Sequence, residues 1–361
     1  MRKAYPILLL CVCLYACQAV ATIPTATAPP TTAATATHPA TLTPTPSPTA
    51  TPIRDRIYPY TIAGLREHPF GPAGISITAI LEETPDYTRY AIAYPSDDLT
   101  ITGVMQVPPG DGPFPVIIMN HGFINRDEYL PGDGTSRVAE VLNRNGYLTI
   151  APDYRGWGGS DDGYSLFHTG LVVDVINLLH AIPSIPQADP SRIGMWGHSM
   201  GGGITTKVLV LDASIRAAVL YAPNSADDAD LIARWGYGCI GDINPGHCNS
   251  ADLLPASLAP ELVLAYQKAA ASPETMRQIA PIYHLESIVT PIQIHIGEAD
   301  GDYIGSTPPE WSYKLFDVLI AAGKPAELYS YPGQRHSFTG EARDLFLQRI
   351  VDFFDRYVKP R

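Results

Sequence analysis

Residues 192–202 have the sequence RIGMWGHSMGG, an apolar strand pattern followed at once by a glycine-rich turn and a helical pattern. A turn this tight requires residues without bulk two positions before and two positions after its central serine, Ser199, and Gly197 and Gly201 meet that requirement. The turn lifts the serine hydroxyl above the sheet at a helix N-terminus, where partial positive charge favours an oxyanion. Ser199 is therefore our candidate nucleophile.

The sequence around this turn alternates strand and helix patterns. We predict eight strands, at 89–94, 100–107, 116–120, 147–151, 192–196, 217–221, 292–296 and 326–330. Helical patterns lie at 136–145, 170–181, 200–210, 309–322 and 341–357. The first two strands are separated only by Ser96-Asp97-Asp98, which suits a hairpin. Strands that alternate with helices form a mainly parallel sheet covered on both faces, so we predict an α/β fold.

One stretch, from about 224 to 288, breaks the alternation with helix-like and loop-like sequence. An insertion at this point of the chain lies over the carboxyl ends of the strands, so we predict a helical cap. Its aromatic residues Trp235, Tyr237 and Tyr266, together with Phe123 and Tyr129, are candidates to line an apolar substrate pocket. Ordinary packing within the cap is the alternative interpretation for each of them.

A serine nucleophile needs a base, and the base needs an acid to orient it. His336 is the histidine with a suitable position, on the loop directly after the last predicted strand. Before it, the strand at 292–296 ends in a loop that contains Glu298, Asp300 and Asp302. We predict Asp300 as the acid, with Asp302 as the main alternative and Glu298 as a solvated side chain.

The tetrahedral intermediate of such a reaction also needs backbone donors aimed at its oxygen. We expect one from Met200, the residue after the nucleophile. The second is expected from Phe123, on the loop Asn120-His121-Gly122-Phe123 that follows the third strand. We predict that His121 supports this loop rather than taking part in the chemistry.

Several segments together resemble the catalytic domain of the prolyl oligopeptidase family, and they are also similar to bacterial dienelactone-hydrolase-like enzymes and acyl esterases. These segments are 115–123, 153–160, 189–202, 297–300 and 331–338. The resemblance covers roughly Tyr87 to the C-terminus. It implies an α/β-hydrolase fold and a serine hydrolase with the triad Ser199, Asp300 and His336, without a cofactor.

The resemblance to the peptidases is incomplete. They carry a large β-propeller, whereas only about forty residues lie between the stalk described below and the sheet of this chain. The residues that flank the nucleophile, His198 and Met200, form a pairing common among esterases and lipases. We therefore expect hydrolysis of carboxylic esters through an acyl-enzyme. A serine peptidase or amidase acting on short peptides is the alternative, and a non-catalytic surface binding module is a more remote one.

The first residues of the chain have a different character. Met1-Arg2-Lys3 and the apolar run 7–16 fit a secretory signal, and the run is too short to span a bilayer. It ends before Cys17 in a pattern that resembles a lipoprotein cleavage box. We predict a signal peptide at 1–16 and a lipidated Cys17, which places the mature protein on the outer face of the cell membrane. Simple secretion and an uncleaved anchor are the alternatives.

Composition sets the remaining expectations. Residues 17–53 are rich in Thr, Pro and Ala and predict a disordered stalk ahead of the hydrolase domain at 54–361. The formal net charge of −12 argues against a nucleic-acid partner. In an exported protein Cys239 and Cys248 predict a disulfide, with two free thiols as the alternative. A zinc site is not expected because only His247 lies nearby.

Overall fold

The computed structural model describes residues 53–71, 74–241 and 248–360. The chain divides into two units, residues 1–49 and 50–361, and all of the described residues belong to the second. The predicted signal peptide, Cys17 and nearly all of the predicted stalk therefore lie outside the described residues. None of the described helices is both long and apolar enough to cross a membrane.

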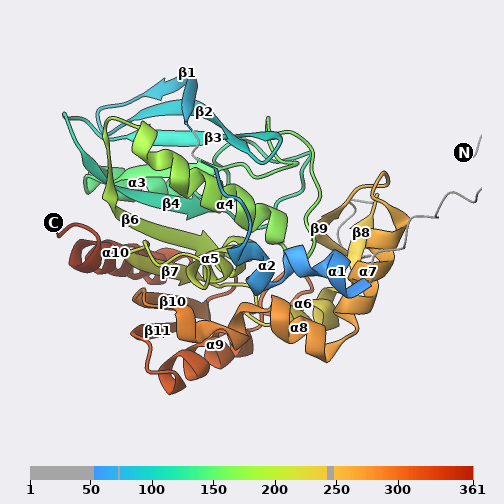
Figure 1. Ribbon diagram of the computed structural model, residues 1–361. Coiled ribbons are helices and arrows are strands. Elements are labelled where there is room, and N and C mark those ends of the chain that lie inside the picture. The colour runs from blue at the N-terminus through green and yellow to red at the C-terminus, as the bar shows by residue number, and fades with distance from the viewer. Residues whose placement is uncertain (1–52, 72–73, 242–247, 361) are drawn as a thin grey trace, which may run out of the picture. The chain divides into compact units, whose positions relative to one another are not determined.

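A nine-stranded sheet forms the centre of the described domain, with the strand order β1-β2-β3-β5-β4-β6-β7-β10-β11 (Figure 1). The strands are β1 (Ser76–Glu83), β2 (Thr88–Ser96), β3 (Leu99–Val107), β4 (Phe114–Asn120), β5 (Leu148–Pro152), β6 (Ala188–His198), β7 (Ala217–Tyr221), β10 (Ile292–Gly297) and β11 (Ala326–Tyr331). All pairs from β5 to β11 are parallel, and the pairs β1-β2, β2-β3 and β3-β5 are antiparallel. The predicted α/β-hydrolase fold is confirmed.

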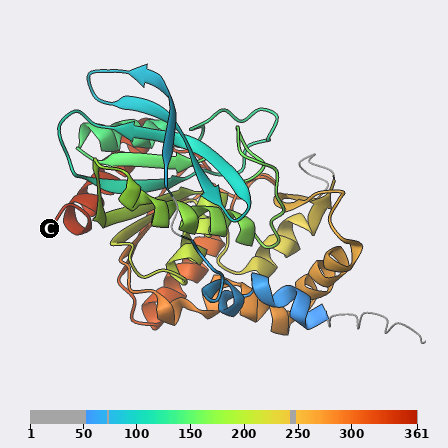
Figure 2. The ribbon, with the colours of Figure 1, turned by 45° about the horizontal axis from the view of Figure 1, so that its top comes forward.

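The expected number of strands was eight, and the additional strand is β1. Figure 2 shows it paired with β2 at the top of the view. Every residue of β1 is exposed, including Ile77, Ile80 and Leu81. A strand that buries neither face lacks the alternation of apolar and polar residues on which the prediction depends.

Helices cover both faces of the sheet. One face carries α3 (Ser136–Arg144) and α10 (Gly340–Tyr357), and the other carries α4 (Thr169–Ala181), α5 (Met200–Leu209) and α9 (Pro309–Ala321). Successive strand residues point to opposite faces, so Met195 packs with α4 and α5 while Trp196 packs with α3 and α10. The central strands β4, β5, β7 and β10 are buried on both sides, which explains their nearly continuous apolar sequences.

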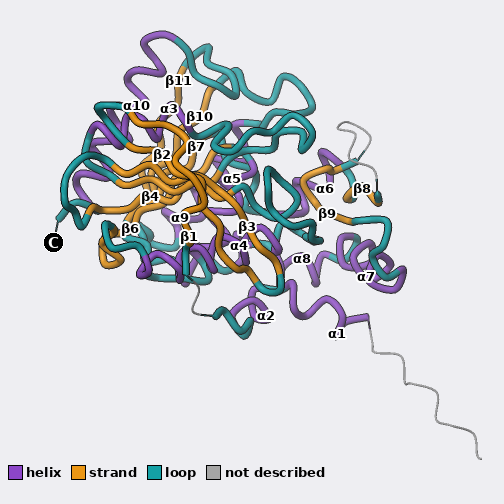
Figure 3. Tube along the Cα trace, turned by 90° about the horizontal axis from the view of Figure 1, so that it is seen from above, coloured by secondary structure: helices purple, strands orange, loops and turns teal. Residues whose placement is uncertain are grey.

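The insertion between β7 and β10 forms the predicted cap, although it is not purely helical. It contains α6 (Asp228–Trp235), β8 (Gly238–Ile240), β9 (Asn249–Leu254), α7 (Pro260–Ala270) and α8 (Pro273–Ile279). Strands β8 and β9 form a small parallel sheet of their own, away from the main sheet in Figure 3. The N-terminal helix α1 (Ile53–Ile57) lies beside α7, and Ile57 joins the small apolar core of the cap.

Buried polar contacts fasten the cap to the sheet domain. Lys207 on α5 lies 3.0 Å from a carboxylate oxygen of Asp228 on α6, and both side chains are almost fully buried. A second contact joins the start of α4 to β9, because the backbone amide of His168 donates to Asp252 at 3.0 Å. Tyr266 on α7 donates its hydroxyl hydrogen to the same carboxylate at 2.7 Å.

Candidate active site

Ser199 lies between β6 and α5 with backbone angles φ 55° and ψ −120°, a strained conformation for a residue with a side chain. Its amide donates to the carbonyl oxygen of Tyr221 on β7 at 2.9 Å. The turn leaves no room for side chains on its two glycines. A Cβ atom on Gly201 would lie 2.0 Å from the carbonyl oxygen of Asn120, and one on Gly197 would lie 2.3 Å from that of Gly201.

His336 and Asp300 form a hydrogen-bonded pair beyond the ends of β11 and β10. Nδ1 of His336 donates to Oδ2 of Asp300 at 2.8 Å, which leaves Nε2 free to accept a proton. The carboxylate also accepts hydrogen bonds from the Gly301 amide at 2.8 Å and the Thr307 hydroxyl at 2.9 Å. Burial raises the pKa of Asp300, but the hydrogen bond and charge of His336, helped by these two donors, outweigh it and hold the pKa below its usual range.

The turn at Ser199 and the loop of His336 are in direct contact through His198. The His198 ring lies 4.8 Å from the His336 ring and 4.5 Å from that of Tyr221. Its Nε2 donates to the carbonyl oxygen of His336 at 3.2 Å. Burial, with a contribution from the charge of His336, lowers the pKa of His198 to about 3, so this ring is neutral and fixes the backbone of the candidate base.

The hydroxyl of Ser199 has no hydrogen-bond partner among the described residues, and the side chain lines an open cleft. It is therefore available to a substrate. Contacts between a nucleophile and its base often tighten only when a substrate is bound.

The other two acids of the Asp300 loop do not contact His336. Asp302 pairs with Arg335 at 3.0 Å on the surface. Glu298 accepts a hydrogen bond from the hydroxyl of Ser330 at 2.9 Å and is also exposed. The structure thus pairs His336 with Asp300, holds their loop against the turn of Ser199 through His198, and leaves both alternative acids outside this pair.

The two predicted oxyanion donors lie beside the serine. A Cβ atom on Gly122 would lie 3.1 Å from Cβ of Ser199, so the loop after β4 passes directly against the nucleophile. Phe123 and Met200 both line the cleft that contains Ser199. The Phe123 amide donates to no other described residue, and the Met200 amide opens α5, where helical amides have no partner within the helix.

His121 lies behind this loop and not in the cleft. Its ring nitrogens are 2.8 Å from the carbonyl oxygen of Gly122 and 3.1 Å from that of Asp153, and burial lowers its pKa to about 4. Tyr129 stacks on His121 with ring centroids 4.7 Å apart and donates its hydroxyl hydrogen to the Asp153 carboxylate at 2.8 Å. Tyr129 is therefore a buried support of the loop, and our prediction that it contacts substrate is wrong.

The cleft has a volume of about 360 Å³ and lies between the sheet domain and the cap. Its described lining residues are Phe123, Ser199, Met200, Asn224, Arg234, Trp235, Cys248, Asn249, Ser250, Ala251, Tyr303, Ile304 and Gly305. Of the predicted pocket aromatics, Phe123 and Trp235 belong to this set. Tyr237 is instead half-exposed beside Tyr266, which is buried with its hydroxyl bonded to Asp252, so these two tyrosines pack within the cap.

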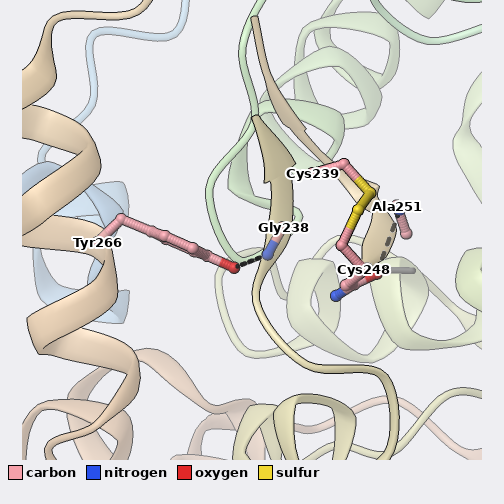
Figure 4. Close-up of a disulfide and its surroundings, with 6 residues drawn as sticks. Gly238, Cys239, Cys248, Ala251 and Tyr266 are labelled. Atoms are coloured by element: carbon pink, nitrogen blue, oxygen red, sulfur yellow. Dashed lines mark hydrogen bonds between the residues drawn. A yellow bond between two sulfur atoms is a disulfide. The ribbon is translucent and has the colours of Figure 1, made fainter. Parts of the chain in front are cut away.

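Cys239 of β8 and Cys248 are joined in a disulfide with their Cα atoms 5.2 Å apart, on the side of β8 opposite the hydroxyl of Tyr266 (Figure 4). Cys248 also lines the cleft, so the disulfide ties one wall of the site to β8. No group of His, Cys, Asp and Glu side chains in the described part of the chain is arranged to hold a metal ion.

Two residues of the site were not found from the sequence. The Thr307 hydroxyl lies 2.9 Å from the Asp300 carboxylate and 3.0 Å from the carbonyl oxygen of Ala222, so its single hydrogen is shared between these two acceptors. Thr307 directly precedes Pro308-Pro309, which is typical of a helix start and carries no signal of a role in catalysis. His198 stands next to Ser199 in the sequence, but its contact with the His336 carbonyl depends on a loop 138 residues away.

The fold and the residues gathered at this cleft define a serine hydrolase of the α/β-hydrolase superfamily. Residues 113–343 match the family described as "Serine aminopeptidase, S33", and the chain belongs to this family.

Among curated proteins, the chain is 32% identical over 126 residues to an uncharacterized 31.7 kDa protein of Escherichia coli, covering 34% of this chain and 42% of that protein. It is 33% identical over 96 residues to the lysophosphatidylserine lipase of Xenopus tropicalis, covering 27% and 23%. The chain thus spans less than half of the length of these relatives.

Solved structures share the fold at low identity. The acylaminoacyl peptidase of Pyrococcus horikoshii is 19% identical with a TM-score of 0.59, covering 76% of this chain and 42% of that chain. Acetyl xylan esterase 1 of a Thermoanaerobacterium species is 16% identical with a TM-score of 0.55, covering 83% and 92%. Peptidases and esterases are therefore both among the structural neighbours.

Proposed function

We propose that this protein is a carboxylic ester hydrolase with Ser199 as nucleophile, His336 as base and Asp300 as the orienting acid. Nε2 of His336 takes the hydroxyl proton as Ser199 Oγ attacks the ester carbonyl carbon. The oxygen of the tetrahedral intermediate is stabilised by the Phe123 and Met200 amides. His336 then gives the proton to the departing alcohol, and an acyl-enzyme remains on Ser199.

Water completes the reaction by the same route. His336 removes a proton from the water as it attacks the acyl-enzyme, and it returns the proton to Ser199 as the acid leaves. Asp300 stays ionised at neutral pH because its pKa is lowered, so it holds the ring in the tautomer that accepts at Nε2.

We choose an ester over a peptide substrate because of the charge of the residues that line the cleft. None of the described residues that line it is an aspartate or a glutamate, and the charged one is the cation Arg234. An aminopeptidase must hold the positive α-amino group of its substrate, and a carboxylate is the side chain that pairs with such a group. The described walls offer hydrophobic rings and amides, which suit an acyl chain.

A serine peptidase is the second candidate. The family description names aminopeptidases, and the likeness to the acylaminoacyl peptidase is a specific reason to test it. The name of that enzyme refers to an acylated amino terminus, which carries no positive charge. The triad chemistry is the same for both candidates, so only the substrate separates them.

The test compares 4-nitrophenyl esters of acetate, butyrate and octanoate with aminoacyl and acylaminoacyl 4-nitroanilides on the full-length chain. We expect turnover of the esters and little turnover of the anilides. Ser199→Ala should lower kcat by on the order of 10³- to 10⁶-fold and abolish labelling by a fluorophosphonate. Near wild-type activity in this variant would refute the mechanism, and an unlabelled, inactive wild type would point to a binding module.

We further propose that the protein is exported as a lipoprotein and acts at the outer face of the cell membrane. The support lies in the sequence alone: a basic start, a short apolar run, Cys17 at its end, and a stalk rich in threonine and proline. The stalk then serves as a tether that holds the hydrolase domain away from the lipid surface.

A further inference from the structure

The cleft beside Ser199 contains an arginine whose hydrogen-bonding capacity is only partly used. Nη2 of Arg234 donates to the carbonyl oxygens of Gly301 at 3.2 Å and Tyr303 at 2.6 Å. Its Nε is buried with no acceptor, and its Nη1 donates to none of the described residues. An arginine stays protonated in a protein, so the cleft holds a permanent positive charge.

No carboxylate among the described residues balances this charge. The acids of α6 and of the loop that Arg234 contacts have other partners. Asp227 and Asp230 pair with Lys314, Asp228 pairs with Lys207, Asp302 pairs with Arg335, and Asp300 is hydrogen-bonded to His336. A half-buried guanidinium without an anionic partner is unfavourable, and an anion that enters the cleft removes this penalty.

The guanidinium is also held in place before any substrate arrives. Its central carbon lies 5.9 Å from the ring centroid of Trp311, which in turn packs edge-on against Trp235 at 5.4 Å. The two carbonyl contacts fix its other side. A cation immobilised in this way binds an anion at a lower cost in conformational entropy than a mobile one.

Asn224 supplies a second unused polar group in the same cleft. Its backbone amide donates to the carbonyl oxygen of Ser199 at 2.8 Å, so it lies directly beside the nucleophile. The residue is only 3% exposed, and its Oδ1 is buried without a partner. The side-chain NH₂ group likewise donates to no described residue and is available to a bound group.

We propose that Arg234, assisted by Asn224, binds an anionic group of the substrate. The substrate class is then an ester that carries a carboxylate or a phosphate near the scissile bond, because both groups match the donors of a guanidinium. This inference rests on the proposed ester hydrolase function and adds the charge of its substrate.

The experiment uses pairs of esters that differ only in charge, with the full-length protein. One pair is the mono-4-nitrophenyl ester of glutarate and its methyl ester, and the other is 4-nitrophenyl 3-phosphonopropionate and its dimethyl phosphonate. The variants are Arg234→Gln, which keeps donors for the two carbonyls without the charge, and Arg234→Lys, which keeps the charge. Arg277→Gln is the control, an exposed cap arginine that stacks on Tyr283 and does not line the cleft.

We expect wild type to prefer the anionic member of at least one pair by about 10-fold or more in kcat/KM. Arg234→Gln should lower kcat/KM for that member by about 10- to 100-fold more than for its neutral partner, mainly through KM, as fits the loss of a charged hydrogen bond. Arg234→Lys should keep part of the preference, and Arg277→Gln should keep all of it. The pair that responds identifies the anion as carboxylate or phosphate.

Two results would overturn this inference while the ester hydrolase stands. One is equal turnover of charged and neutral esters by wild type. The other is an equal loss on both members in Arg234→Gln, which would mean that Arg234 only holds the Gly301–Tyr303 loop. Failure of wild type to cleave any ester, with cleavage of the anilides, would instead overturn the proposed function itself.

Discussion

Replacement of Asp300 by Asn tests whether Asp300 is the acid of the triad, because it changes the hydrogen bond between Oδ2 of Asp300 and Nδ1 of His336. The carboxylate accepts three hydrogen bonds, from His336 Nδ1 at 2.8 Å, the Gly301 amide at 2.8 Å and the Thr307 hydroxyl at 2.9 Å. The oxygen of an Asn side chain can still accept from Gly301. The NH₂ group of Asn then takes the place of Oδ2 and faces His336 Nδ1 and the Thr307 hydroxyl, which both donate to Asp300 in the wild type.

The imidazole responds to this change by moving its proton. With an amide donor opposite Nδ1, His336 must accept there and carry its proton on Nε2, so it cannot take the proton of Ser199. The corresponding change in a well-studied triad lowers kcat by about 10⁴-fold. We expect a loss of that order here, which corresponds to roughly 5 kcal/mol of activation free energy.

The matched control is Asp302→Asn, two residues further along the same loop. Its ion pair with Arg335 is largely exposed, and such pairs contribute about 0–1 kcal/mol to stability. We expect kcat within about twofold of wild type, because this carboxylate lies outside the proposed triad. Hydrolysis of 4-nitrophenyl butyrate, with melting curves to verify folding, measures both variants. A loss of less than tenfold for Asp300→Asn, or a larger loss for Asp302→Asn, would refute the assignment.

Three further predictions concern the disulfide, a buried histidine and the N-terminus. Cys239→Ser/Cys248→Ser should change KM and substrate preference more than the melting temperature, because Cys248 lines the cleft and the crosslink closes a short loop, which contributes roughly 2–3 kcal/mol. Free thiols in the purified protein, or an unchanged substrate profile of the double variant, would contradict this. Burial, helped by the charge of Lys207, lowers the pKa of His168 to about 4. Between that pH and about 6.5, the usual pKa of a histidine, the unfolded chain binds a proton that the folded protein does not. The free energy of unfolding therefore falls as the pH falls through this range. The test variant is His168→Asn, because Asn tolerates the left-handed backbone at this position (φ 59°). In urea unfolding between these pH values, the free energy of unfolding of the variant should fall by up to about 1.4 kcal/mol less per pH unit than that of wild type. Identical slopes would refute the argument. Cys17→Ser should leave the precursor unprocessed or release soluble protein, and equal membrane association of variant and wild type would remove the lipoprotein proposal.

Much of the fold was predictable because its strands are buried. The eight expected strands are all present, and the signal is strongest for the central parallel strands β4, β5, β7 and β10, which are buried on both faces and therefore apolar. The missed elements are those without such a signal. Strand β1 is exposed along its whole length, and β8 has only three residues, Gly238–Ile240. Their pairing depends on tertiary contacts that no local pattern carries.

The candidate site was predictable where chain order restricts the choice. Ser199 is identified by its glycines, and His336 by its place after the last strand. The choice between Asp300 and Asp302 needed the structure, because both follow the same strand and only the path of the loop decides which carboxylate reaches the imidazole. Aromatic residues were the weakest predictions, since Tyr129 and Trp235 have the same apolar character whether they support a loop or line a cleft.

The buried ion pair between Lys207 on α5 and Asp228 in the cap also determines how a substrate reaches Ser199. A cap that swung away from the sheet would pull Lys207 from Asp228 and leave two desolvated charges unpaired, at a cost of several kcal/mol. The entrance to the cleft therefore keeps a constant width, because the cap does not open. Access to Ser199 then depends on the cross-section of the substrate, and no contact with a lipid surface is needed to move the cap. The rate on a short-chain ester should accordingly rise smoothly with its concentration, without a jump where the ester begins to form droplets.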